Sequence, residues 1–292
     1  MKELSYYHPA CIYMFFAAIF LFAVISRNPV FIVISFAGAV IYSSSVLGIQ
    51  VILTEIKKIL PFMLVITAVN PLINRYGGTP LFFINDSAFT LEALIYGFFI
   101  SMMLEAVFIW GKCFNTINDS EKTLYIASYL SRTLSIIISM SLRFIPMLKI
   151  KLNEIKNTRK AMGLYYCDNL YEKIKSHLTI ISVLLTWSIE NSVDTAASMR
   201  SRGFGIRGRT SYSVFKMRKP DVMLITVSLI FIIFMIILNK KVFEYSYYPY
   251  LQEISTDTFH IISYVFSALF VLVPTVIELR SRIIWKLLKS KT

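Results

Sequence analysis

The residues of this sequence that are best suited to acid–base catalysis or metal binding are three histidines, His8, His177 and His260, which lie far apart along the chain. None of them has an Asp or Glu at the spacing of a metal site. The HExxH pattern of metalloproteases, the GxxxxGK phosphate loop and the GxSxG nucleophile elbow are all absent. The sequence therefore predicts a protein that is not an enzyme, with no catalytic residue, no cofactor and no metal site.

Ionic chemistry is concentrated instead between residues 143 and 219. This segment holds fifteen Lys and Arg but five Asp and Glu, a net charge of +10 out of the chain's formal +13. Nucleic-acid binding usually interleaves such charges with aromatic side chains, yet residues 143–163 and 190–210 contain only Phe144 and Phe204. We therefore expect no nucleic-acid partner, and anionic membrane lipid is the better match for some of these charges.

Glu105 is a second candidate for ionic chemistry, because it falls inside an apolar stretch. It follows Glu92 by thirteen residues, which places it about 20 Å further along a helix. An ionisable side chain at that depth of a membrane is a functional candidate. The other interpretation puts Glu105 near the cytoplasmic interface of a tilted span. If it is functional, the chain is a stand-alone channel or secondary carrier that uses Glu105.

The elements that position these residues are expected to be membrane helices. The 292 residues are 56% hydrophobic and 16% charged, whereas soluble domains carry roughly 25% charged residues. The pattern predicts an all-α polytopic protein with about six transmembrane helices and no cleaved signal peptide. The expected spans are residues 10–26, 29–47, 59–72, 90–113, 222–238 and 259–276.

Two long helices are expected between the fourth and fifth spans. The first runs from about residue 133 to a break near Gly163, and the second runs from near Tyr171 to near Gly203. Both end at a glycine, as helices that close with a positive φ commonly do. Small side chains recur on the second helix and predict that the two helices cross closely there. These helix-crossing residues are Ser188, Ser192, Ala196 and Ala197.

The distribution of Lys and Arg predicts the orientation. Four spans before the basic segment and two after it leave that segment and both termini on the cytoplasmic side of the cell membrane, as the positive-inside rule requires. For this reason we do not count residues 133–148 as a span. The expected domains are residues 1–113 with four spans, 114–219 with the pair of long helices, and 220–292 with two spans and a basic tail.

Five motifs in order now resemble a known family. They are NPLINRYGGTPLF at 70–82, TLEALIYG at 90–97, SLRFIP at 141–146, AMGL at 161–164 and ASMRSRGF at 197–204. Together they resemble the transmembrane T component (EcfT family) of energy-coupling-factor ABC importers, over roughly residues 10 to 240. The order of the five motifs is specific, whereas each one alone is weak.

The resemblance implies a scaffold that transmits energy. In that family the T component joins two cytoplasmic ABC-type ATPases to a membrane subunit that binds a vitamin or metal ion, and two coupling helices end in Ala-Arg-Gly-type motifs that dock on the ATPases. Here the second motif is Ser201–Arg202–Gly203. The first is Ala161–Met162–Gly163, with Met where the family has Arg, so that Arg159 or Lys160 would supply the charge. This difference suggests two unlike contacts, as on an ATPase heterodimer.

Overall fold

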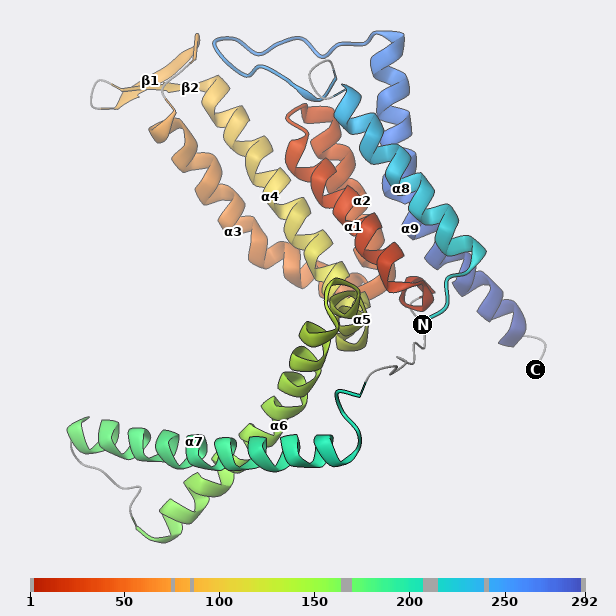
Figure 1. Ribbon diagram of the computed structural model, residues 1–292. Coiled ribbons are helices and arrows are strands. Elements are labelled where there is room, and N and C mark those ends of the chain that lie inside the picture. The colour runs from red at the N-terminus through yellow and green to blue at the C-terminus, as the bar shows by residue number, and fades with distance from the viewer. Residues whose placement is uncertain are drawn as a thin grey trace. The chain divides into compact units, whose positions relative to one another are not determined.

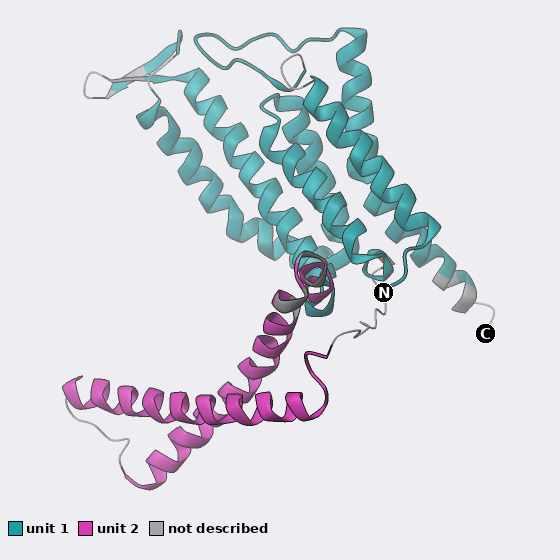
Figure 2. Cartoon of the chain, in the orientation of Figure 1, with its two compact units in different colours: residues 1–122, 215–292 teal, residues 123–214 magenta. Residues whose placement is uncertain are grey.

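The computed structural model describes residues 3–74, 77–84, 87–163, 170–206, 215–238 and 242–289. The chain divides into two compact units, residues 1–122 with 215–292 and residues 123–214 (Figure 2). The first and last of the three domains expected from the sequence therefore belong to one unit. The loop expected at 164–169 and the basic residues Arg207 and Arg209 lie outside the described residues.

The first unit is a bundle of helices that lie side by side (Figure 1). Among the described residues, four helices are long and apolar enough to cross a membrane, namely α2, α4, α8 and most of α9. The expectation of an all-α polytopic membrane protein is confirmed. After a short 3-10 turn, η1 (Glu3–Tyr6), the helices of this unit are α1 (Pro9–Ile25), α2 (Pro29–Leu47), α3 (Ile49–Ile73), α4 (Leu91–Ile117), α8 (Lys219–Leu238) and α9 (Thr258–Lys289).

Two of these helices are longer than the sequence predicts. α3 begins at Ile49 and contains Glu55, Lys57 and Lys58, which lie before the span expected at residues 59–72. Only Gly48, with a φ of 90°, separates α2 from α3. α9 likewise continues to Lys289, far past residue 276. In both cases the charged segment contains no Gly or Pro that would end the helix, so the helix extends beyond its apolar part.

The starts of α1 and α2 follow the same local rule. Each has Pro at its first position, where the missing N–H costs no hydrogen bond. A side chain caps each start: the backbone N–H of Ala10 donates to Nδ1 of His8 at 3.3 Å, and that of Val30 donates to Oδ1 of Asn28 at 3.1 Å. The boundary between the spans expected at residues 10–26 and 29–47 is thus a capped helix start.

Aromatic side chains fill the centre of the bundle. Phe231 of α8 stacks on Phe270 of α9 with ring centroids 3.9 Å apart, and Tyr42 of α2 stacks on Trp110 of α4 at 5.6 Å. Buried serines on these helices, such as Ser228, donate a hydrogen bond from the hydroxyl to a backbone carbonyl oxygen one turn earlier. α2 accordingly packs between α4 and α9, while α1 packs against α4 and α8.

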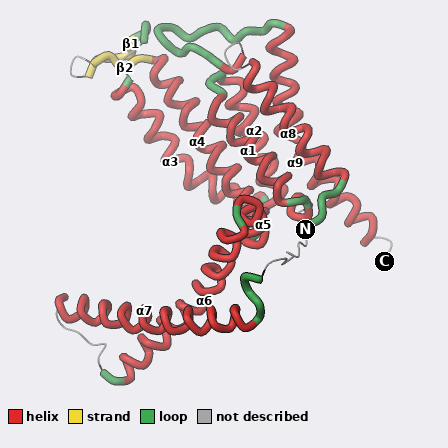
Figure 3. Tube along the Cα trace, viewed as in Figure 1, coloured by secondary structure: helices red, strands yellow, loops and turns green. Residues whose placement is uncertain are grey.

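A β-hairpin, which the sequence analysis did not predict, connects α3 to α4 (Figure 3). Its antiparallel strands are β1 (Pro80–Ile84) and β2 (Ser87–Thr90). Thr90 occupies the N-cap position of α4, but its side chain makes no capping hydrogen bond. The adjacent Glu92 is buried and accepts hydrogen bonds from the backbone N–H and the hydroxyl of Thr79.

The segment between α8 and α9 ties several turns of the bundle together. The backbone N–H groups of Arg27 and Asn28 donate to the carbonyl oxygen of Phe243, at 3.0 and 3.1 Å. The N–H of Gly78 donates to the carbonyl oxygen of Pro249 at 2.8 Å. A Cβ on Gly78 would overlap the ring of Tyr250, so a larger residue at this position would displace that exposed ring.

The second unit contains the two long helices. α5 (Ser120–Leu130) leads into α6 (Arg132–Ala161), and α7 (Leu170–Ser201) follows. Residues 133–148 form one continuous helix with 149–161, as predicted, even though Pro146 lies inside it. Among the described residues α6 does not qualify as a membrane span. The helices α6 and α7 cross each other within this unit (Figure 1).

Candidate partner-docking site on the two long helices

The carboxyl end of α6 is closed by glycine. Gly163 has a φ of 73°, a conformation that side chains other than glycine's seldom adopt. Its backbone N–H donates to the carbonyl oxygen of Lys160 at 3.1 Å, and the N–H of Met162 donates to that of Thr158 at 3.0 Å. Met162 is therefore the C-cap residue of α6.

The carboxyl end of α7 has the same backbone arrangement. Gly203 has a φ of 78°, and its N–H donates to the carbonyl oxygen of Arg200 at 3.0 Å. The N–H of Phe204 donates to the carbonyl oxygen of Met199, also at 3.0 Å. These two bonds form a Schellman motif, which holds the last turn in one conformation. Arg202 therefore occupies on α7 the position that Met162 occupies on α6.

Both helix ends expose the residues that the sequence analysis selected. Lys160, Ala161 and Met162 are exposed on α6, and Ser201 and Arg202 are exposed on α7. Arg159 is half-buried, and its Nε has no hydrogen-bond partner among the described residues. We call these two ends the tips: tip 1 is residues 159–163 and tip 2 is residues 201–203.

Apolar side chains accompany the charges. Met162 is 67% exposed at tip 1, and Phe204, directly after tip 2, is 40% exposed. Ile206 is 69% exposed. Exposed apolar side chains beside a cation are a common composition of protein interfaces, where Arg and large apolar residues are enriched.

The crossing of α6 and α7 fixes where the tips lie. Nζ of Lys151 on α6 lies 5.8 Å from the ring centroid of Trp187 on α7, at the distance of a cation–π contact. From this pair, α6 runs ten more residues to Ala161, about 15 Å, and α7 runs fourteen more to Ser201, about 21 Å. Both tips therefore project well away from the crossing.

A groove of about 350 Å³ lies between α6 and the last third of α7. Arg202 of tip 2 lines this groove together with Arg143 of α6. Neither guanidinium forms a salt bridge within the described ranges of the chain. The other residues that line the groove are Met140, Phe144, Met147, Asn191, Asp194, Thr195, Ser198 and Met199.

The small residues selected for the crossing do not line this groove. Ser188 is half-buried, but Ser192, Ala196 and Ala197 are exposed. The groove with α6 is lined instead by Asn191, Thr195 and their neighbours, which occupy the adjacent stripe of α7. The sequence analysis missed this stripe because a helical period shows which residues share a face but does not show which face a partner covers.

Glu105 lies on α4, far in sequence from both tips. Its side chain is 5% exposed, and Oε1 has no hydrogen-bond partner among the described residues. It does not line the cavity that α4 forms with α2 and α3. The described part of the chain also contains no group of three or more His, Cys, Asp and Glu that could hold a metal ion.

Comparisons with known proteins agree with this arrangement. The sequence model of the CbiQ family, described as "cobalt transport protein", matches residues 6–212 of this chain. A segment of the chain is 40% identical over 111 residues to the energy-coupling factor transporter transmembrane protein EcfT of Lactococcus lactis, covering 37% of this chain and 41% of that protein. The EcfT of Lactobacillus helveticus is 33% identical over 90 residues, covering 30% and 32%.

A third relative extends further along this chain. An uncharacterised protein of Mycoplasma pneumoniae is 22% identical over 164 residues, which cover 52% of this chain and 38% of that protein. The matched segments thus span about two fifths or less of the length of these relatives. Helices α8 and α9 lie beyond the part that the family model matches.

Proposed function

This chain belongs to the CbiQ family of cobalt transport proteins, and from that membership and the two exposed tips we propose that it is the scaffold and energy-transducing subunit of an energy-coupling-factor importer. In this role it is not an enzyme. It is a multi-pass membrane protein that couples ATP hydrolysis by two cytoplasmic ATPases to the uptake of a vitamin or metal ion. A separate integral membrane subunit binds that substrate.

The observation that carries the proposal is the matching construction of the two tips. Each helix ends in the same glycine-closed turn, and each presents its C-cap side chain to solvent. Arg202 has no carboxylate partner within the described ranges of this chain. A guanidinium held on a fixed backbone turn forms paired hydrogen bonds with a partner's carboxylate. We propose that each tip docks into a groove on one ATPase.

The crossing supports coupled movement of the tips. The helices α6 and α7 line the same groove and are joined by the contact between Lys151 and Trp187. A displacement of one tip would therefore move both helices together as one rigid body. Closure of the two ATPases on ATP would thus reorient the pair of helices, in the manner of other rigid-body transitions.

The unlike side chains at the two caps suggest unlike partners. Tip 2 presents Arg202, whereas tip 1 presents Met162 at the same backbone position. At tip 1 the available cations are Arg159 and Lys160, one turn earlier on α6. We infer that the two ATPase grooves differ in the same way, as they would in a heterodimer.

α7 also carries an apolar stripe that a membrane-embedded partner or lipid could cover. Ile174, Leu178, Ile181 and Leu185 recur at the spacing of one helical face and are each at least 50% exposed. Such a stripe needs an apolar surface to cover it. The substrate-binding subunit and the lipid of the inner leaflet both provide one.

Reconstitution tests the proposal against the stand-alone carrier that uses Glu105. We expect liposomes that contain this chain, both ATPases and a substrate-binding subunit to accumulate substrate only when ATP is supplied. Liposomes that contain this chain alone should show no uptake. Uptake by this chain alone that is lost in Glu105→Gln would instead support the carrier and contradict the proposal.

The orientation that we propose makes a separate prediction. With Cys167 replaced by Ser, a single cysteine is introduced as Ser201→Cys at tip 2 or as Gln252→Cys between α8 and α9. Both positions are exposed, and Cys11 and Cys113 are buried. We expect a membrane-impermeant maleimide to label Gln252→Cys in intact cells, and to label Ser201→Cys only after the cells are opened. Labelling of Ser201→Cys in intact cells would exclude cytoplasmic tips.

A further inference from the structure

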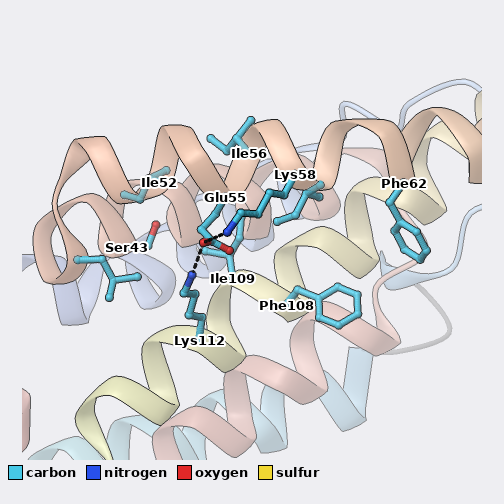
Figure 4. A pocket seen from close by; sticks show the side chains of 11 residues that line it. Ser43, Ile52, Glu55, Ile56, Lys58, Phe62, Phe108, Ile109 and Lys112 are labelled. Carbon is cyan, nitrogen blue, oxygen red and sulfur yellow. Dashed lines mark hydrogen bonds and ion pairs between the residues drawn. The ribbon is translucent and has the colours of Figure 1, made fainter.

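A cavity of about 400 Å³ lies between α2, α3 and α4, apart from both tips and within the first unit (Figure 4). Its walls are mainly aliphatic and aromatic, with a small group of charged side chains among them. The lining residues are Ser43, Leu47, Ile52, Glu55, Ile56, Lys58, Ile59, Phe62, Phe108, Ile109 and Lys112. A volume of this size lies within the usual range of small-molecule sites, roughly 300–1,000 Å³.

The charged side chains form a triad with a net positive charge. Oε1 of Glu55 accepts from Nζ of Lys112 at 2.7 Å and from Nζ of Lys58 at 3.2 Å. The single carboxylate therefore holds two ammonium groups near each other, and the three side chains together carry a net charge of +1. Each ammonium has three N–H donors, so both lysines keep donors for another acceptor.

The apolar part of the cavity lies to one side of this triad. Figure 4 shows Phe62 and Phe108 together at one end of the cavity, away from Lys112. Their ring centroids are 6.5 Å apart, and the side chains are 49% and 58% exposed. Seven residues separate Glu55 from Phe62 on α3, a rise of about 10 Å. The cavity is thus cationic at one end and apolar at the other.

The cavity also lies near the ends of the helices that form it. Leu47 is the last residue of α2, Ile49 is the first of α3, and Lys112 is five residues before the end of α4. α2 and α4 are both long and apolar enough to cross a membrane. The charged end of the cavity is therefore expected at the depth of lipid headgroups, with the apolar end facing the acyl chains.

We propose that this cavity binds one anionic glycerophospholipid, with its phosphodiester on Lys58 and Lys112 and an acyl chain along Phe62 and Phe108. The single negative charge of such a lipid matches the net +1 of the triad. The apolar end distinguishes the lipid from a free phosphate ion, which would leave that surface uncovered. Basic pockets between membrane helices bind anionic headgroups in this way.

Lipid titration of the purified full-length chain in detergent tests the proposal, with native mass spectrometry as the readout. We expect phosphatidylglycerol to bind at least about fivefold more tightly than phosphatidylcholine with the same acyl chains. Lys112→Gln and Lys58→Gln should each reduce that preference by about fivefold. Lys57→Gln is the matched control, because Lys57 is exposed on the same helix and does not line the cavity.

Several outcomes would overturn this assignment. Equal binding of the two lipids would show that the charge of the triad does not select a headgroup. Equal losses in Lys57→Gln and Lys112→Gln would show a general surface attraction. Displacement of phosphatidylglycerol by inorganic phosphate at the same concentration would show that the site binds the anion alone. The test contains no ATPase, so its result does not depend on the role that we propose for the tips.

Discussion

Arg202→Glu is expected to abolish co-purification of the ATPases with this protein while leaving its insertion in the membrane unchanged. The exposed guanidinium has no carboxylate partner within the described chain, so reversal of its charge should not disturb the fold of α7. At an interface it would place two carboxylates against each other. Truncating one partner of a buried charge pair costs about 2–5 kcal/mol, which weakens assembly by at least about thirtyfold, and reversal should cost no less.

Lys175→Glu provides the matched control for this experiment. Lys175 is exposed on the same helix, far from tip 2, and the substitution changes the net charge by the same amount. We expect this variant to retain both ATPases in an affinity pull-down from detergent-solubilised membranes. Retention of the ATPases by Arg202→Glu at the level of Lys175→Glu would show that Arg202 does not contribute to docking.

Gly38→Leu is expected to have the largest effect on stability. Gly38 lies where α2 packs on α9, and a Cβ at this position would overlap Cγ1 of Val271 and lie 3.3 Å from its Cβ. Val is branched at Cβ and has few alternative rotamers, so the two helices must separate to admit a larger side chain. Overpacking of this kind costs about 1–3 kcal/mol. The measurement is thermal unfolding of the purified protein in detergent.

The control for this substitution is Gly111→Leu on α4. Apart from its chain neighbours and the backbone of its own helix, a Cβ on Gly111 would meet no atom of the described residues within 4 Å, so a larger side chain there has open space. We expect its unfolding temperature to remain close to that of the unmodified protein. Equal destabilisation by the two substitutions would show that the added leucine side chain is unfavourable at either site, and that the contact with α9 does not account for the effect, because replacing glycine in a helix interior is by itself favourable. The result also tests whether α9, which the family model does not match, is an integral part of the bundle.

Much of this architecture was predictable from local sequence signals. Gly163 and Gly203 mark helix ends, because glycine readily adopts the positive φ that closes a helix there. The absence of a span at residues 133–148 followed from the distribution of positive charge. The same signals placed both tips, whose sequences end in these glycines.

The parts that were missed depend on contacts between distant segments. The hairpin of β1 and β2 lies between the expected spans 59–72 and 90–113, and the pairing of its two short strands was not predicted. The pairing of Glu55 with Lys112 joins residues on different helices. The stripe of α7 that faces α6 includes Asn191 and Thr195 rather than the smallest side chains nearby. No local period identifies such partners.

The unlike caps have a consequence for how a complex is put together. A subunit with two identical tips could bind two different ATPases in either of two orders, and the two orders would form equally often. Met162 and Arg202 stand on equivalent backbone turns. If the tips dock on two unlike ATPases, as we propose, exchanging the ATPases would place the neutral thioether of Met162 against the carboxylate that pairs with Arg202. Under this proposal the mismatch would favour one order of assembly over the other.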